Sequence, residues 1–426
     1  MYRIRTILTL WILILFPFIS KSQNETSSPY SSFGVGILNQ QSNTTSASMG
    51  GVGYAIQEKN NINFKNPASY TNFDSSTFHV DFAFSVINST LRTDDAEHQS
   101  MRAKFDYLVI GLPIISRWSS SLGVIPFSEV GYNIYDSTEV EHIGKVNYRY
   151  SGSGGLMQLF WGNGFKITNH FSLGLNLSYL WGNLNSSKYA EYDDLTIYNS
   201  KITQNILVDG MRFNIGLQYR FPLKNKQELM VGISYENSLF MPTREDETVM
   251  NYRGPFALIS TFDTVWLRVK EDGIKGKMKL PQFVGVGLGY KVDSRYLFAA
   301  DFTWQNWKKF SDGNDDQFQD NLITAIGMQY VPNAKSNRYI SKINYRAGFS
   351  YSTGYIVIRG HPIPSYSISV GAGFPITTFS SSSLINVKLE YGKMGTTSHG
   401  LIDDSYWRLT LNINLNEKWY QRVKLD

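Results

Sequence analysis

Side chains that could catalyse a reaction or hold a metal ion are scattered along this sequence. There is no cysteine, and the six histidines are His79, His98, His142, His170, His361 and His399. Their spacing matches no metal-binding motif, and they are spread over predicted strands, turns and loops, whereas a hydrolase needs a Ser–His–acid or paired-acid site. His79 and Asp81 alternate onto one face of a predicted strand, as residues lining a polar lumen do. We therefore expect no enzymatic activity, no metal and no cofactor.

A second group of residues could guide an apolar ligand rather than react with it. Pro126 lies inside a strand predicted at 119–135, where its missing N–H must remove a hydrogen bond from the ladder. The predicted apolar patch on this strand and the preceding one consists of Leu108, Ile110, Leu112, Ile125, Pro126 and Phe127. This assignment takes the alternate residues Tyr107, Val109, Leu122, Val124, Val130 and Tyr132 to face lipid. An apolar patch beside a break in the ladder could let a ligand leave sideways without entering water. Alternatively, the patch only packs against the segment that precedes the barrel.

The elements that would position these residues are β-strands. Apolar residues occupy every second position in segments such as 78–86, 171–179, 213–219, 385–391 and 407–415. Such alternation gives each strand one apolar and one polar face. After residue 22 no apolar run approaches the roughly 20 residues that a membrane helix needs.

The polar face must point inward if these strands cross a membrane. A Lys or Arg facing lipid near the bilayer midplane costs roughly 2–4 kcal/mol. Asp81, Lys388, Glu390 and Arg408 are therefore expected inside. Because backbone groups find no water in hydrocarbon, the strands must close into a barrel. We predict an all-β fold, a transmembrane antiparallel β-barrel with an N-terminal plug.

Short turns alternate with long polar connections, and this alternation predicts fourteen strands. They are expected at 76–88, 103–113, 119–135, 150–167, 171–182, 203–221, 227–236, 280–291, 295–307, 321–332, 342–352, 364–375, 383–392 and 405–416. Residues 262–270 also resemble a strand, but counting them alone would break the alternation. We place them in a β-ribbon within a long extracellular loop at 237–279. Sixteen strands remain an alternative.

The start of the chain predicts export to the outer membrane of a Gram-negative cell. Arg3 and Arg5 precede an apolar stretch at 7–19, and Ser20-Lys21-Ser22 suits signal peptidase cleavage after Ser22. A retained anchor helix is the alternative. The formal charge of +5 comes without basic clusters, so no nucleic-acid partner is expected.

These features divide the chain into a signal peptide (1–22), an N-terminal hatch or plug (23–75), the barrel (76–416) and a periplasmic tail (417–426). The plug segment does not alternate but is rich in glycine and contains Asn66, Pro67 and Ala68. Irregular backbone at membrane depth must be buried in protein or line a cavity. A loose periplasmic arm is the alternative.

The plug segment carries a family resemblance. Ser48-Met49-Gly50-Gly51-Val52-Gly53-Tyr54-Ala55, then Asn66-Pro67-Ala68-Ser69 before the first strand, resembles the hatch of the FadL/TodX family. Pro29-Tyr30-Ser31-Ser32-Phe33-Gly34 is similar to the opening of its divergent members. The resemblance implies a fourteen-stranded outer-membrane channel for fatty acids and other hydrophobic molecules. It also implies lateral release into the membrane through a kinked third strand.

The leading expectation is therefore passive uptake of a hydrophobic, fatty-acid-like small molecule by lateral diffusion past the hatch. Its expected partners are this ligand and outer-membrane lipid. The alternative is a FadL-like barrel that does not transport and instead serves as a subunit of an outer-membrane secretion or protein-assembly complex.

Overall fold

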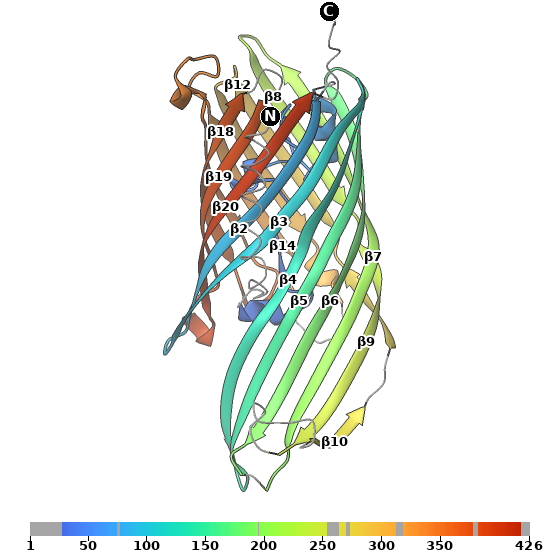
Figure 1. Cartoon of the computed structure of the whole chain (residues 1–426), viewed down its shortest axis with the longest axis vertical. Coiled ribbons are helices and arrows are strands. Elements are labelled where there is room, and N and C mark those ends of the chain that lie inside the picture. The colour runs from blue at the N-terminus through green and yellow to red at the C-terminus, as the bar shows by residue number, and fades with distance from the viewer. Residues whose placement is uncertain are drawn as a thin grey trace, which may run out of the picture.

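The chain forms a closed antiparallel barrel of fourteen strands (Figure 1). The computed structural model describes residues 28–74, 77–194, 196–253, 264–269, 273–311, 318–377 and 382–418. The barrel strands, in the order in which they pair, are β2 (Thr77–Arg92), β3 (Glu97–Ile115), β4 (Trp118–Val140), β5 (Gly144–Lys166), β6 (Phe171–Tyr192), β7 (Asn199–Pro222), β8 (Gln227–Glu236), β12 (Phe283–Val292), β13 (Tyr296–Gln305), β14 (Asn321–Tyr330), β15 (Asn344–Ser352), β18 (Ser365–Thr377), β19 (Ser382–Met394) and β20 (Asp403–Lys418). β20 pairs with β2 from Thr77↔Lys418 to Arg92↔Asp403, which closes the ring.

All fourteen predicted strands are confirmed, and several extend further than predicted. β6 reaches Tyr192 and β7 begins at Asn199, so most of the loop expected between them is strand. The predicted ribbon strand is also present: β10 (Thr264–Val269) pairs with β9 (Leu239–Tyr252). β9 pairs in turn with the outer part of β7 and with β11 (Ile274–Leu280). The wall formed by β4, β5, β6, β7 and β9 therefore projects beyond the rest of the barrel, as Figure 1 shows.

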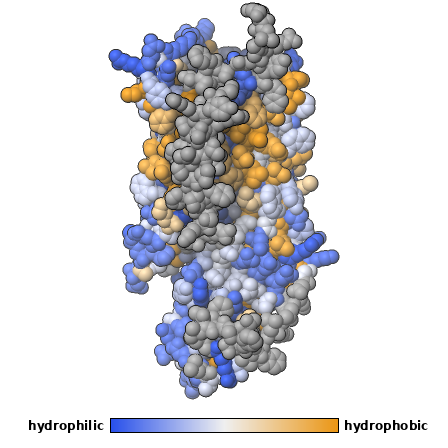
Figure 2. All heavy atoms as spheres, in the orientation of Figure 1, coloured by the Kyte–Doolittle hydropathy of each residue, from blue (hydrophilic) through white to orange (hydrophobic). Residues whose placement is uncertain are grey.

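The two faces of the wall differ in polarity as expected. Apolar side chains such as Leu177, Phe302, Ile368 and Leu409 are exposed on the outside. On the face of the molecule that Figure 2 shows, hydrophobic residues gather along the barrel wall and hydrophilic residues lie toward its ends. Asp81, Lys388 and Glu390 are buried inside, and Arg408 lines the interior cavity described below. In the part of the chain that the structure describes, no helix is long and apolar enough to cross a membrane.

Residues 28–74 fill much of the barrel interior. Their elements are η1 (Pro29–Ser32), β1 (Ile37–Leu38), α2 (Thr44–Ala47) and η2 (Pro67–Asn72). Most of their side chains are buried. We call residues 28–74 the plug. Residues 1–27 and 419–426, which include the expected signal peptide and most of the expected tail, lie outside the described residues. β20 ends at Lys418, two residues beyond the predicted end of the barrel.

Glycines of the wall make room for the plug backbone. A Cβ on Gly232 would lie 1.8 Å from the carbonyl oxygen of Tyr54. One on Gly174 would lie 2.2 Å from the carbonyl carbon of Pro67, and one on Gly348 would lie 2.0 Å from that of Met49. Only glycine permits these approaches without displacing the plug or the wall. The plug is therefore closely fitted to strands on opposite sides of the barrel.

Candidate functional site: a split in the wall and the cavity behind it

The wall divides between β3 and β4. Their pairing runs from Ile115↔Trp118 to Leu108↔Val124 and then stops, within two strands that the structure describes completely. Beyond that point β3 pairs with β2, and β4 pairs with β5 as far as Val140↔Gly144. Figure 1 shows β3 and β4 diverging toward the projecting end of the wall. We call this unpaired stretch the split.

Pro126 marks the start of the split. Pro126 pairs with Met157 of β5, whereas Ser128 pairs with Leu156, so Phe127 is the extra residue of a β-bulge. A bulge bends its strand and increases the local twist. Proline has no N–H to donate to β3. Both effects favour separation of β4 from β3. The sequence alone predicted only the loss of one ladder hydrogen bond at Pro126.

The plug covers part of the edge of β4 that the split leaves open. β1 pairs with β4 through Ile37↔Glu129 and Leu38↔Ser128. The N–H of Asn39 donates to the carbonyl of Phe127 at 3.0 Å, and Gln41 Nε2 donates to the carbonyl of Pro126 at 3.2 Å. β1 therefore takes, for two residues, the place that β3 has left.

Charged side chains bridge the split beside β1. Lys104 of β3 forms an ion pair with Glu129 of β4 and also donates to the side-chain oxygen of Asn39. Arg102 Nη2 lies 3.9 Å from the second carboxylate oxygen of Glu129. These side chains are mostly buried, with 12% of Lys104 and 21% of Glu129 exposed. The ammonium of Lys104 thus connects β3, β4 and the plug.

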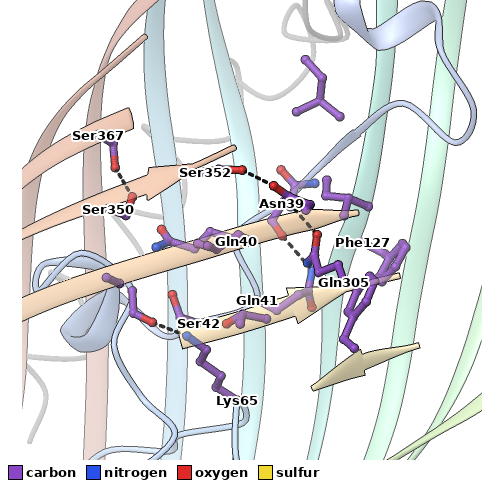
Figure 3. A pocket seen from close by; sticks show the side chains of 18 of the residues that line it. Asn39, Gln40, Gln41, Ser42, Lys65, Phe127, Gln305, Ser350, Ser352 and Ser367 are labelled. Carbon is purple, nitrogen blue, oxygen red and sulfur yellow. Dashed lines mark hydrogen bonds between the residues drawn. The ribbon is translucent and has the colours of Figure 1, made fainter. Parts of the chain in front are cut away.

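A cavity of about 330 Å³ lies behind the split, between the plug and the wall. Near the split it is lined by Ile37 and Leu38 of β1 and by Ile125 and Phe127 of β4. Arg102 and Glu129 also line it, so the cavity extends to the residues that bridge the split. On the far side it reaches β13, β14, β15 and β18, as the view in Figure 3 shows.

The structure places two of the six residues of the predicted apolar patch, Ile125 and Phe127, in the lining of this cavity. Ile125 and Phe127 are buried inside, with 3% and 2% of each residue exposed. Pro126 is buried between them. The predicted inward orientation of these β4 residues therefore agrees with the structure, and Phe127 packs against apolar residues of both plug and wall.

The predicted orientation of the β3 residues is wrong. Leu108 is the register partner of Phe82 and Val124 on the outer face of the barrel. Ile110 is the partner of Val80 and Leu122 on the same face. Leu112, two residues further along, lies on the same outer face. Leu108 is 40% exposed, whereas Tyr107 and Val109 are buried against the plug side.

The physical reason is a second β-bulge. Ala83 pairs with Tyr107 but Phe84 pairs with Phe105, so Asp106 is an extra residue that changes which residues face inward. The Tyr107 hydroxyl also accepts a hydrogen bond from the N–H of Thr44 in the plug, at 2.8 Å. Nothing in the alternation of β3 alone indicates this long-range contact.

The bulge at Phe127 also reverses the faces of β4. Val130 and Tyr132 were expected to face lipid with Leu122 and Val124. Instead Val130 is buried, and both Val130 and Tyr132 belong to the inner apolar cluster that contains Phe127. One extra residue exchanges the two faces of every following position.

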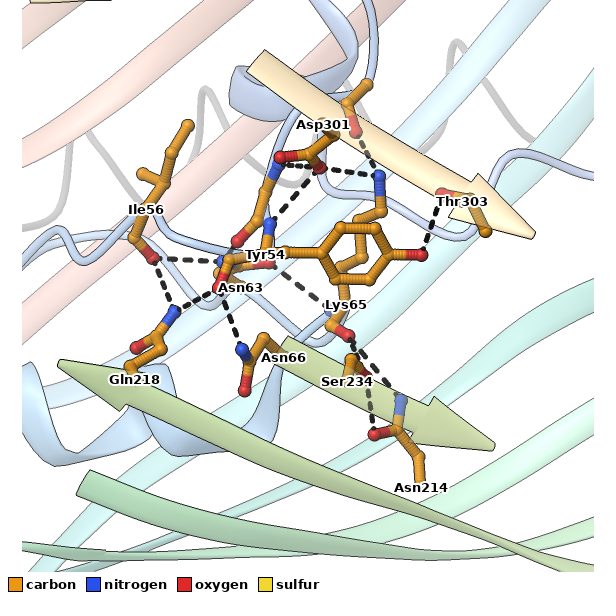
Figure 4. Close-up of polar contacts among 12 residues, drawn as sticks. Tyr54, Ile56, Asn63, Lys65, Asn66, Asn214, Gln218, Ser234, Asp301 and Thr303 are labelled. Atoms are coloured by element: carbon orange, nitrogen blue, oxygen red, sulfur yellow. Dashed lines mark hydrogen bonds and ion pairs between the residues drawn. The ribbon is translucent and has the colours of Figure 1, made fainter. Parts of the chain in front are cut away.

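The expected hatch residues form the centre of a polar network between plug and wall (Figure 4). Asn66 Nδ2 donates to the carbonyls of Tyr54 at 2.7 Å and Leu217 at 3.2 Å, while its Oδ1 accepts from the N–H of Ala68. Pro67 begins η2, where a missing N–H costs no helix bond. Asn66, Pro67 and Ala68 are all buried.

Lys65 and Asp301 add an ion pair that sequence reasoning missed. Lys65 Nζ lies 2.9 Å from Asp301 Oδ2, and the same oxygen accepts from the N–H of Gly53 at 2.8 Å. Burial disfavours the ammonium, but Asp301, Tyr54 and Glu236 together outweigh this effect, so the pKa of Lys65 is raised. No sequence signal joined Asp301 to Lys65. Within the described residues, no group of three or more His, Cys, Asp or Glu side chains could hold a metal.

Comparison with known proteins supports the fold assignment. A family model described as BamG matches residues 3–426. The toluene transporter TodX of Pseudomonas putida superimposes with a TM-score of 0.62 at 14% identity, over 90% of this chain and all of that one. A FadL homologue of Pseudomonas aeruginosa gives 0.59 at 13% identity, over 90% and 99% of the two chains. The toluene transporter TbuX of Ralstonia pickettii gives 0.59 at 14%, over 90% and 100%. A search of curated protein sequences finds no match.

Proposed function

The chain belongs to the BamG family, as a divergent member of the FadL-like barrels, and we propose that it is an outer-membrane channel for passive uptake of small, largely hydrophobic molecules. In this proposal a ligand enters the cavity between the plug and the wall and leaves sideways through the split. Solved relatives of this fold include proteins described as toluene transporters, which supports the proposal by analogy.

The observation that carries the proposal is the continuity of the cavity with the split. Ile37, Phe127 and Glu129 line the cavity and also border the stretch where β3 and β4 are unpaired. A ligand that moved between these strands would pass from protein directly into hydrocarbon. Its apolar part would then never be exposed to bulk water. Such exposure would cost about 25 cal/mol per Å² of apolar surface.

A straight route through the barrel is disfavoured by the fit of the plug. Lys65, Asn66 and Tyr54 join the plug to β7, β8 and β13, and wall glycines lie against plug backbone on opposite sides. Moving the whole plug would break these bonds together. Displacing β1, which is held by few bonds, would open the split at much lower cost.

Cross-linking the split tests this function. The chain has no cysteine, so a Lys104→Cys/Glu129→Cys variant can be joined by a short bismaleimide after purification. In proteoliposomes, the cross-linked protein should take up a hydrophobic fluorescent dye at the rate of empty vesicles. The matched control carries the same linker at Val387 and Leu411, paired residues of β19 and β20 away from the split. Uptake that continues through the cross-linked split would overturn the lateral route.

A second function, as a non-transporting subunit of an outer-membrane secretion or protein-assembly complex, is supported by the projecting wall. The outer part of β7 pairs with β9 from Asn199↔Tyr252 to Val208↔Thr243, and β9 carries β10 and β11. Transport of a small molecule requires no such extension. A sheet of this size outside the membrane is suited to contact with another protein.

Shortening the projection separates the two functions. A variant in which residues 239–279 are replaced by a short turn should keep the barrel, because β8 and β12 already pair directly. If the chain is a complex subunit, gentle extraction should recover the full chain with a stoichiometric partner and the shortened variant without it. If the chain is only a channel, the full chain is recovered alone and dye uptake is the same in both proteins.

A further inference from the structure

We infer that the cavity takes amphipathic ligands whose head is uncharged and carries several hydroxyl or amide groups, as a glycoside or an acylglycerol does. This inference rests on the proposed uptake function and specifies the class of ligand that the same cavity would accept. It differs from the expectation of a fatty-acid-like ligand, whose head is a carboxylate.

The charges of the cavity wall favour a neutral head. Five cationic and five anionic side chains line it: Lys65, Arg102, Arg212, Lys393 and Arg408, and Glu129, Glu236, Asp301, Glu390 and Asp404. Lys65 is paired with Asp301 at 2.9 Å and Arg212 with Glu236 at 3.1 Å, while Arg102 lies 3.9 Å from Glu129. A carboxylate entering this balanced lining would find no excess positive charge, and its desolvation would not be repaid.

Neutral hydrogen-bonding groups form one side of the cavity. Ser350 and Ser352 of β15, Ser367 of β18 and Gln305 of β13 face Gln40 and Gln41 of the plug (Figure 3). The hydroxyls of Ser350 and Ser367 lie 2.9 Å apart, and Ser352 donates to Asn321 Oδ1 at 2.7 Å. Hydroxyl and amide groups both donate and accept, so this side matches a head that does the same.

The opposite side of the cavity, which adjoins the split, carries large apolar side chains beside Arg102 and Glu129. Ile125 and Phe127 of β4, Phe160 of β5 and Phe64 of the plug line it. Phe127 and Phe160 are each at most 2% exposed, so their rings are held in place by their surroundings. A ligand lying across the cavity would thus place its head against β13, β15 and β18. Its tail would point toward β4 and the opening into lipid.

The size of the cavity is compatible with this class. A volume of about 330 Å³ lies at the lower end of the range of roughly 300–1,000 Å³ that is usual for small-molecule sites. It suits a single head with a short chain, and a longer chain would extend into the split. The unequal polarity of the two sides of the cavity, rather than its volume, should make an amphiphile bind more tightly than a bare hydrocarbon.

Binding of three probes with equal chain length tests the inference. The full chain in lipid nanodiscs is titrated with octyl glucoside, octanoate and octane, each below its aggregation concentration, and the heat from empty nanodiscs is subtracted. We expect saturable binding of octyl glucoside that is at least roughly tenfold tighter than that of octanoate or octane. Octanoate or octane binding as tightly, or no saturable binding of the glucoside, would overturn the inference.

A matched pair of variants locates the binding site. Ser350→Ala/Ser367→Ala should weaken octyl glucoside binding roughly tenfold, because two hydroxyl partners are lost, and leave octanoate unchanged. The control, Ser186→Ala/Ser187→Ala, removes two half-buried hydroxyls from the outer part of β6, outside the cavity lining. Equal effects of both variants would contradict the assigned site.

The bismaleimide cross-link across the split separates this inference from the function on which it rests. If the glucoside is not preferred but the cross-link stops dye uptake, the head-group inference fails and the channel function stands. If the glucoside is preferred but uptake continues through the cross-linked split, the lateral channel fails and the cavity's preference stands.

Discussion

Lys104 of β3 and Glu129 of β4 form an ion pair across the stretch of wall where these two strands exchange no backbone hydrogen bonds. The same ammonium donates to Asn39, next to the plug strand that pairs with Glu129. The two halves of the split and the plug therefore meet at the ammonium of Lys104. Any change that weakens this contact should alter the width of the split and the position of β1 together.

Neutralising Glu129 should widen the split. Glu129→Gln removes the anion between Lys104 and Arg102, and hydrogen bonds to charged groups contribute about 1.5–3 kcal/mol each. Nitroxide labels on cysteines at Met101 and Tyr135, both exposed, would report the separation of β3 and β4. We expect a longer and broader distance distribution than in the labelled parent protein.

The control for this measurement is Glu139→Gln. Glu139 lies on β4, as Glu129 does, but its register partner is Lys145 of β5, so it does not bridge the split. The label distances should not change in this variant. A distribution in Glu129→Gln that is identical to the parent's would show that the ion pair does not hold the split.

A disulfide between β1 and β4 should hold the plug strand against the open edge. Leu38 and Ser128 are register partners, so their Cα atoms lie at the separation of about 4.5–5.5 Å that a disulfide can span. Oxidised Leu38→Cys/Ser128→Cys should lose most dye uptake, and a reductant should restore it. A disulfide between Val387 and Leu411, on β19 and β20, should leave uptake unchanged in both redox states. Full uptake by the oxidised plug variant would mean that β1 need not move.

Adding one methyl group at Gly232 should disturb the packing of the plug against the wall. The Cβ of Gly232→Ala would lie 1.8 Å from the carbonyl oxygen of Tyr54, so the barrel or the plug must shift. Overpacking typically costs about 1–3 kcal/mol and here meets rigid backbone. We expect a lower thermal unfolding midpoint and faster proteolysis of the plug.

Gly289→Ala is the matched control for the plug seat. Its Cβ would lie 3.0 Å from the terminal methyl of Met230, which can rotate away, and at ordinary contact distances of 3.5 Å from the Cβ of Met230 and 3.7 Å from that of Ala55. This variant should unfold within a degree or so of the parent. Equal destabilisation by both substitutions would argue against backbone contact as the cause.

Restoring an N–H at position 126 should narrow the split. The Pro126 carbonyl accepts a hydrogen bond from Gln41 of the plug, on the side of β4 that faces β3. In a strand the N–H of a residue points to the same side as its carbonyl, so an N–H at this position could donate toward β3. One added hydrogen bond contributes about 1 kcal/mol, equivalent to roughly a fivefold shift in population. Pro126→Val should therefore slow dye uptake severalfold and slow amide exchange in the neighbouring part of β3. The control is Pro222→Val, at the end of β7. Unchanged uptake in Pro126→Val would show that Pro126 does not control the width of the split.

The barrel itself could be predicted because its physics is local. Over residues 171–179 of β6 and 407–415 of β20, the lipid-facing positions are apolar and the inward positions are polar or small, so the period-two alternation is visible in the sequence. The connections then fixed the number of strands. Even β10 could be assigned to the ribbon, because an unpaired fifteenth strand would have broken the alternation of short and long connections.

The details of the site could not be predicted because they depend on bulges and on distant contacts. Asp106 and Phe127 each add one residue to a strand, and neither insertion is visible in the alternation of its own strand. As a result Leu108 was placed inside and Val130 outside, and both assignments are wrong. The partner of Lys65, 236 residues away along the chain, is decided only by the position of the plug within the closed barrel.

The close fit of the plug also constrains the order in which the protein can assemble. Tyr54 lies against β8 and β12, Met49 against β14 and β15, and Pro67 against β6. A finished barrel offers no room for this backbone to be threaded in afterwards. The β2–β20 seam, which joins the first and last barrel strands, should therefore close only after the plug is seated. Biogenesis would then proceed by wrapping the wall around its own N-terminal segment, so that this segment acts as the template on which the barrel is completed.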